Sequence, residues 1–415
     1  MRVFFWRARG DGPGMPPAVR PTLRDPRFGL LVAGETVNSI GGWASAIVLW
    51  GFAAYRFNAS PYAVSVTIVC WAAPPALLGP LMGVYVDRLG AKRALVAGYA
   101  AAAAAALGMA AAGSLMMLDI AAVAYGTARS LSGPAAGALP PRIVGADDLL
   151  AANALLGAAA SAGQVAGPLA ASAALALSGF PAAFILDAAS YAVGAAVVAP
   201  LPLRPASAAG SPEHPGWSGE LIAGIVLVAR RRGLRLVVMA GTAVTFTSAA
   251  FLVVEPLYAR HVLHRPPSQF ALFEVAAGTG SVLAGLAISR IRAHLAGGKV
   301  LAASGIGYGL AACLFIGTVS VPAAYTGAFL WGVSGALFGA VALTTLQQLA
   351  PISAHGRVMG VAATVQSWTE TIGLPLAGIT LASLGTRAGA LALAGVAVAA
   401  GVACLGSVVA HPVEP

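Results

Sequence analysis

Long apolar segments separated by short polar turns make up almost all of this sequence. A helix needs roughly 20 apolar residues to cross a bilayer, and twelve segments of suitable length follow one another along the chain. They lie at about 28–55, 62–86, 94–112, 115–139, 149–178, 181–202, 235–258, 268–289, 299–318, 321–348, 357–384 and 387–410. Only 9% of the residues are charged, whereas a soluble domain carries about 25%. The sequence therefore predicts an all-α integral membrane protein with twelve transmembrane helices.

The longest polar break, residues 203–234, divides these segments into two sets of six, which predicts two pseudo-symmetric six-helix bundles. We expect an N-terminal cytoplasmic tail (1–27), a first bundle (28–202), a cytoplasmic linker with an amphipathic helix (203–234), a second bundle (235–410) and a C-terminal tail (411–415). A repeat of this kind places a substrate site near the bilayer midplane, between the two halves.

The positions of the cations predict the orientation. If the N-terminus is cytoplasmic, 19 of the 24 Lys and Arg residues lie on the cytoplasmic side. The external loops then carry Arg56, Arg260, Arg265 and Arg387, and Arg129 lies within a helix. Because cytoplasmic loops are enriched in Lys and Arg, we expect a multi-pass membrane protein with both termini in the cytoplasm. This distribution also argues against nucleic acid as the partner of the +10 net charge.

A charged turn between the second and third apolar segments carries the most specific motif. Its residues are Gly83, Asp87, Arg88, Gly90, Lys92 and Arg93. This G-x-x-x-D-R-x-G-x-K-R spacing resembles the loop between helices 2 and 3 of the major facilitator superfamily of secondary transporters. The resemblance implies a latch that closes the cytoplasmic side of the two halves; a plain positive-inside turn is the alternative. A degenerate copy of this motif occurs at Gly285–Arg290, with Ser289 at the acidic position.

Two further stretches are similar to motifs of the same family. Arg129-Ser-Leu-Ser132-Gly133 resembles its Arg-x-x-Gln-Gly element. The stretch from Gly163 through Gly167 and Pro168 resembles its antiporter motif G-x-x-x-G-P-x-x-G-G, with Ala171 and Ser172 replacing the last two glycines. Close helix packing is the alternative role for these glycines. The run from Pro134 to Gly167, through Leu139-Pro140-Pro141-Arg142, Leu150 and Asn153, resembles the drug, siderophore and macrolide exporter branch. This resemblance implies the inner (cytoplasmic) membrane.

Charged residues deep inside a membrane need a partner or a water-filled cavity. Glu35 and Arg129 lie at similar depth in the first and fourth segments, so they either pair permanently or Glu35 carries a coupling proton whose binding Arg129 perturbs. Glu35, Asn38, Gly42 and Ser45 follow helical spacing and form one polar face. These residues are candidates for proton coupling or substrate binding.

Acidic residues of the other segments give further candidates. Glu370, with Gln366 one turn earlier, is the deepest acid of the second half, and a hydrogen-bonded packing role is the alternative. Glu274 is a candidate with a polar face extending to Gly278 and Ser281. Asp187 and Glu255 lie near the outer helix ends, and we expect them to reach external water or nearby arginines.

The sequence thus predicts a secondary transporter that exports a small amphipathic molecule by alternating access, with proton antiport. An importer or lipid transporter of the same fold, or a transport-inactive sensor or scaffold, is the alternative. An enzyme is not expected, because the six histidines fall in loops or at helix ends. No cofactor, metal site or disulfide is expected, since the three cysteines lie far apart. The expected partners are the substrate, protons and lipids, and the protein is expected to be a monomer.

Overall fold

The computed structural model describes residues 26–144, 148–202, 217–288, 298–351 and 354–410, and every regular element within these ranges is a helix. Twelve of the described helices have at least 19 residues. They are α2 (Pro26–Gly51), α3 (Pro61–Leu89), α4 (Ala91–Ala110), α5 (Leu115–Gly137), α7 (Leu149–Leu177), α8 (Phe180–Val198), α10 (Arg232–His261), α11 (Pro267–Ile288), α12 (Gly298–Gly317), α13 (Val321–Leu349), α14 (His355–Leu384) and α15 (Thr386–Ala410). Shorter elements are the π-helical turn η1 (Phe52–Arg56), α6 (Pro140–Ile143) and α9 (Trp217–Arg230).

Most of the expected tails and part of the expected linker lie outside the described residues, and so do Ser289 and Arg290 of the second charged turn. Ten of the described helices are long and apolar enough to cross a membrane. The two others, α5 and α14, are less apolar because they carry residues such as Arg129 in α5 and Gln366 and Glu370 in α14. The predicted fold class, an all-helical multi-span membrane protein, is confirmed.

Local sequence signals set the helix ends. Ser60 begins α3 by accepting a hydrogen bond from the backbone N–H of Ala63, with Pro61 in the first turn, and both features favour a helix start. At the charged turn, α3 continues through Leu89 and α4 begins at Ala91. Gly90 alone separates them, with φ of +82°, a conformation that only glycine adopts readily. The turn is therefore shorter than the polar stretch 87–93 suggests.

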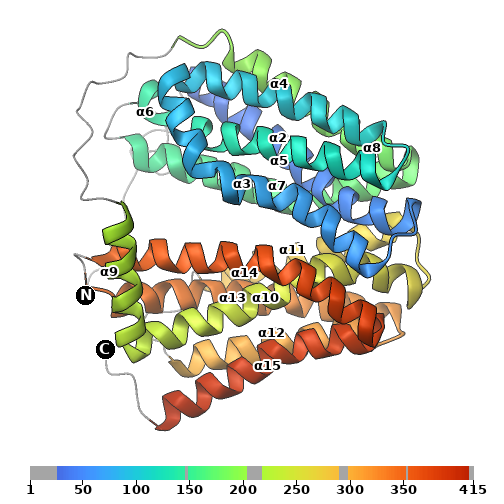
Figure 1. Ribbon diagram of the computed structural model, residues 1–415, viewed down its shortest axis with the longest axis vertical. Helices are drawn as coiled ribbons and strands as arrows, with labels where there is room; N and C mark the ends of the chain where they lie inside the picture. Colours follow the sequence, from blue (N-terminus) through green and yellow to red (C-terminus); the bar gives the residue numbers. More distant parts are fainter. Residues whose placement is uncertain (1–25, 145–147, 203–216, 289–297, 352–353, 411–415) are drawn as a thin grey trace, which may run out of the picture.

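The helices form two bundles with the same internal pairing (Figure 1). The first bundle pairs α2–α7, α2–α8, α3–α5, α4–α5 and α4–α8; the second pairs α10–α14, α10–α15, α11–α13, α12–α13 and α12–α15. Each pair in one bundle corresponds to the pair formed by the equivalent helices of the other. This repetition is the arrangement expected of a transporter built from two repeats.

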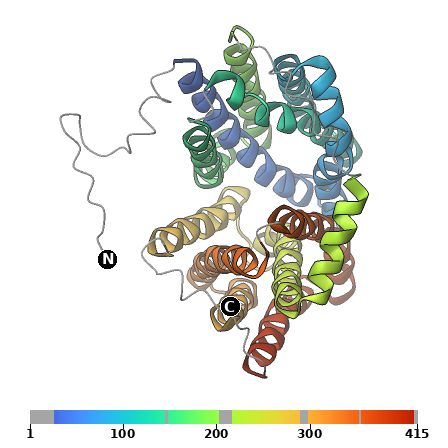
Figure 2. The same cartoon turned by 90° about the vertical axis from the view of Figure 1, so that its left-hand side faces the viewer.

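The two bundles touch along α3–α14 and α7–α11 and separate toward α6 and α9 (Figure 1). Hydrogen bonds join them at the opposite end, where Ser172 donates to the Ser268 carbonyl at 2.9 Å and Tyr55 donates to the Arg265 carbonyl at 3.0 Å. Viewed from the side of α6 and α9, the bundles stand apart with α9 along the edge of the second (Figure 2). We call these the closed end and the open end.

Candidate functional site

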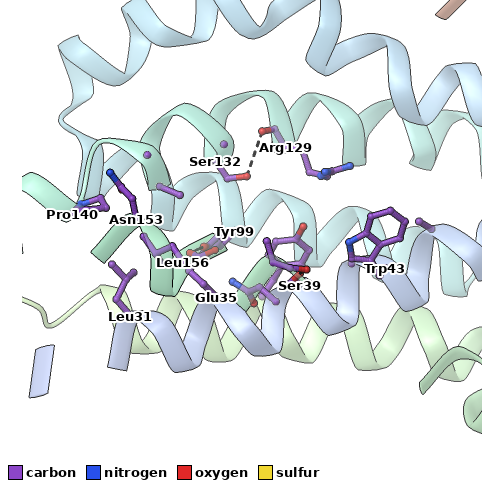
Figure 3. A pocket seen from close by; sticks show the side chains of 18 of the residues that line it. Leu31, Glu35, Ser39, Trp43, Tyr99, Arg129, Ser132, Pro140, Asn153 and Leu156 are labelled. Atoms are coloured by element: carbon purple, nitrogen blue, oxygen red, sulfur yellow. Dashed lines mark hydrogen bonds between the residues drawn. The ribbon is translucent and has the colours of Figure 1, made fainter. Parts of the chain in front are cut away.

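A cavity of about 500 Å³ lies within the first bundle. Its wall is formed by Leu31, Glu35, Asn38, Ser39, Gly42, Trp43, Ala46, Trp71, Tyr99, Arg129, Ser132, Gly133, Ala136, Gly137, Pro140, Asn153, Leu156, Ala160 and Tyr191. The α2 residues of this wall recur every three or four positions, so they share one face of that helix. Figure 3 shows side chains from several helices converging on this space. The wall is mostly apolar and contains one acid and one cation.

Glu35 is half-buried and accepts a hydrogen bond from the hydroxyl group of Tyr99 on α4. One turn further along α2, Asn38 is 7% exposed. Its amide oxygen and nitrogen have no hydrogen-bond partner within the described residues. Because an unpaired buried amide is costly, a polar group bound in the cavity would satisfy it. These two side chains are therefore the polar part of the α2 face.

Arg129 of α5 lies over the indole ring of Trp71 from α3, with 4.8 Å between its guanidinium carbon and the ring centroid. This is a cation–π contact. The described contacts contain no ion pair between Arg129 and Glu35, although both line the cavity. The fixed ion pair considered from the sequence is thus not formed, and each group has a different partner.

Asp187 of α8 is completely buried, so the expectation that it reaches external water was wrong. Its carboxylate accepts a 2.7 Å hydrogen bond from the hydroxyl group of Tyr125. That hydroxyl lies 3.2 Å from the hydroxyl of Tyr191, whose ring is 5.4 Å from the ring of Tyr99. A polar network thus runs from the cavity wall into the bundle. Tyrosines within apolar segments were the missed signal, since a buried hydroxyl needs a partner.

Glu255 was also expected to reach external water, and this was wrong, because its side chain is 1% exposed. It lies beside Glu274, within hydrogen-bonding range. Both belong to the second bundle and neither lines the cavity. Glu370 and Gln366 are exposed on α14 and are likewise not part of the cavity wall.

The charged turn lies at the open end. Arg88 and Arg93 are exposed, and Lys92 donates a 3.0 Å hydrogen bond to the Leu201 carbonyl beyond α8. This bond lies within the first bundle. A side chain at Gly83 would meet no atom within 4 Å, and the side chain of Asp87 lies outside what the structure describes.

The glycines of the predicted antiporter motif bring α7 against α2. A Cβ atom at Gly163 would collide with Ser39, and one at Gly167 would collide with the Cβ of Trp43. Pro168 follows inside α7 and is buried. Ser39 also donates to the Ala160 carbonyl at 3.2 Å. Since Ser39 and Trp43 line the cavity, this close packing positions part of its wall.

No group of three or more His, Cys, Asp or Glu side chains within the described ranges is arranged to hold a metal ion. The arrangement is instead that of a binding cavity with mostly apolar walls and a few oriented polar groups, as is usual for small-molecule sites.

Comparison with solved structures shows the same fold at low sequence identity. The crystal structure of the D323A mutant of the nucleoside transporter NupG has a TM-score of 0.73 at 13% identity, covering 92% of this chain and 99% of that chain. A bacterial homologue of the human lysosomal transporter Spinster, inward-facing and unoccupied, has a TM-score of 0.70 at 13% identity, covering 96% of each chain. A peptide transporter POT in complex with sulfate has a TM-score of 0.72 at 14% identity, covering 94% and 98%.

Among curated proteins, an uncharacterized MFS-type transporter, YfiS of Bacillus subtilis (strain 168), is 34% identical over 62 residues. That stretch spans 15% of this chain and only 15% of the relative. The family model described as Major Facilitator Superfamily matches residues 31–291, which is more than half of the chain. Together with the two-bundle fold, this match shows that the chain belongs to the major facilitator superfamily of secondary transporters.

Proposed function

We propose that this transporter exports a small amphipathic molecule from the cytoplasm by alternating access, coupled to inward movement of protons through Glu35. The observation that carries the proposal is the cavity itself. Its apolar wall, with Trp43 and Trp71, suits the apolar part of such a molecule, and its few polar groups, Asn38 and Arg129 among them, suit a polar part.

The orientation follows from the cations of the described residues. Those at the open end are Arg27, Arg88, Lys92, Arg93, Arg142, Arg230, Arg231, Arg232, Arg235, Lys299 and Arg357; those at the closed end are Arg56, Arg260, Arg265 and Arg387. By the positive-inside rule, the open end faces the cytoplasm. The cavity is then accessible to a cytoplasmic substrate in this state, and both termini are cytoplasmic.

The coupling step uses the two charged groups of the cavity wall. A proton arriving at Glu35 neutralises its carboxylate, which weakens the charge-assisted hydrogen bond from the Tyr99 hydroxyl and lets the two side chains move apart. This rearrangement alters the cavity wall on α2 and α4 directly. Arg129, held over Trp71, would contact an electron-rich or polar group of the substrate. Substrate and proton then bias the same pair of states in opposite directions, as antiport requires.

Other candidates take supporting roles in the proposal. Asp87, Arg88, Lys92 and Arg93 form new contacts between the bundles when the cytoplasmic end closes, with Gly83 and Gly90 shaping the turn. Gly163, Gly167 and Pro168 hold α7 against α2 during that movement. Glu370 and Gln366, exposed on α14, are the second candidates for binding the proton or a cationic substrate.

Uptake into everted membrane vesicles tests the proposal. Fluorescent amphipathic compounds, cationic, neutral and anionic, are offered in the presence of a proton gradient. Loss of a hydrogen bond to a charged group costs about 1.5–3 kcal/mol, which is roughly a 10- to 100-fold loss of affinity. Arg129→Gln is expected to lose uptake of at least one compound by this amount. The control Thr127→Val, on the same helix but outside the cavity wall, keeps it. Uptake equal in both variants would contradict the proposed site.

A further inference from the structure

Glu255 of α10 and Glu274 of α11 form an acid pair that the cavity does not include, and Glu255 is buried while Glu274 is half-buried. Their carboxyl groups lie within hydrogen-bonding range of each other. Glu255 is 1% exposed, and its Oε2 atom has no hydrogen-bond partner in the described structure. Two carboxylates and an unpartnered buried oxygen point to a missing positive ligand, because an unpaired buried charge is strongly unfavourable.

The pair lies where the two bundles meet at the closed end. Phe270 and Gly278 stand one turn before and one turn after Glu274, so the three residues share a face of α11. A Cβ atom at Gly51 of α2 would lie 3.2 Å from the Phe270 ring, and one at Gly278 would lie 3.6 Å from the Gln164 carbonyl of α7. The first bundle therefore covers this face of α11. Separation of the bundles at this end would uncover it to water.

Within the described parts of the chain, no cation pairs with either acid. Tyr308 of α12 faces both acids, and its hydroxyl is hydrogen-bonded to Ser248 of α10. Arg260, one turn beyond Glu255 on α10, instead donates to the Ala54 carbonyl and lies 5.9 Å from the ring centroid of Tyr55. Of the described groups, only Glu274 contributes a charge that acts on Glu255. Two adjacent carboxylates repel each other when both are ionised, and a proton shared between them removes that repulsion.

We propose that Glu255 and Glu274 form a second proton-binding site, which holds a shared proton while the closed end is shut and releases it when the bundles separate there. With this end shut, the proton removes the repulsion between α10 and α11. With this end open, water stabilises both carboxylates and the proton leaves. The site goes beyond the proposed function, because it requires neither Glu35 nor any particular substrate or transport direction.

The test measures the width of the closed end against pH in the purified full-length protein. Cys70, Cys313 and Cys404 are replaced by alanine, and spin labels are attached to cysteines introduced at Ala111 and Val319. These positions are exposed at the closed end, one in each bundle. Raising the pH from 5 to 9 is expected to shift the label-to-label distances toward longer values.

Substitutions test whether this pH response depends on Glu255 and Glu274. Glu255→Gln and Glu274→Gln together are expected to abolish the shift, since two amides can hydrogen-bond without a proton. If the double variant does not fold, each single variant is expected to lose at least half of the shift, because the amide can donate to the remaining carboxylate. Glu35→Gln, which would remove coupling in the proposed function, is expected to keep the shift. The proposal is overturned if the Gln variants respond to pH as the parent does, or if sodium at constant pH, rather than pH, changes the distances.

Discussion

The hydroxyl group of Tyr125 donates a 2.7 Å hydrogen bond to Asp187, and both side chains are completely buried between helices of the first bundle. This bond joins α5, which carries Arg129, to α8. A buried carboxylate persists only where donors and nearby positive charge replace water. Here Tyr125 supplies a close donor and Arg129 supplies the positive charge. The network therefore holds the cavity wall in place from behind.

Removing the Tyr125 hydroxyl is expected to destabilise the protein. Tyr125→Phe removes the hydrogen bond that the buried Asp187 carboxylate accepts from Tyr125, which costs about 1–3 kcal/mol of folding free energy. The melting temperature of the purified protein in detergent should fall accordingly. Tyr62→Phe, at an exposed position, is the control and should melt like the parent. Equal melting temperatures for Tyr125→Phe and the parent would show that the bond contributes nothing to stability.

Replacing different glycines of α7 by alanine is expected to change the stability of the protein in opposite directions. Gly163→Ala and Gly167→Ala place a methyl group against Ser39 and Trp43, and overpacking of this kind costs about 1–3 kcal/mol. Gly157→Ala meets no atom within 4 Å, and alanine favours a helix by about 1 kcal/mol over glycine. Thermal unfolding of the three variants checks this. Destabilisation by Gly157→Ala as large as that by Gly163→Ala would contradict the packing described for α7.

Arg260 is expected to hold the closed end together. Its guanidinium group, on α10, donates a hydrogen bond to the Ala54 carbonyl in η1, across the boundary between the bundles. Loss of a charge-assisted hydrogen bond costs about 1.5–3 kcal/mol, so Arg260→Gln should shift the conformational equilibrium roughly tenfold or more toward opening at this end. The labelled positions 111 and 319 report the change as longer distances. Arg56→Gln, exposed at the same end, is the control, and equal distances in both variants would rule out this role for Arg260.

The sequence was sufficient for the membrane-spanning fold because ten of the described helices carry their own signal, an apolar run of suitable length. It was less informative about helix ends. A hydropathy change marks where an apolar run ends, but the helix can continue beyond it, as α3 does through Arg88 to Leu89. The charged residues of that stretch therefore lie on the helix rather than in a long loop.

The candidate site could be predicted only in part. Glu35 and Arg129 were found because a charge within an apolar run is visible in the sequence, and both line the cavity. Their partners were not visible, since Tyr99 is 64 positions from Glu35. Asp187 and Glu255 were misjudged because distance from a helix end says little about burial. The packing of neighbouring helices covers both side chains, although they lie near the outer ends of their spans.

The Tyr99 hydroxyl is expected to tune coupling rather than binding. Tyr99→Phe removes the donor to Glu35 but keeps the aromatic wall, so substrate affinity should change little while the proton dependence of transport shifts. Transport measured over a pH series in everted vesicles separates the two effects. Tyr85→Phe, exposed on α3, is the control; an unchanged pH profile in Tyr99→Phe would contradict a coupling role for this bond.

The central claim, that Glu35 carries the coupled proton, is tested most directly by proton flux in proteoliposomes challenged with a transported compound. The measurement compares the parent protein with Glu35→Gln and with Glu370→Gln, which alters the second candidate acid, outside the cavity wall. The account predicts substrate-driven proton flux in the parent and in Glu370→Gln, and its loss in Glu35→Gln. Substrate movement without proton flux, or flux that survives in Glu35→Gln and is lost in Glu370→Gln, would contradict it.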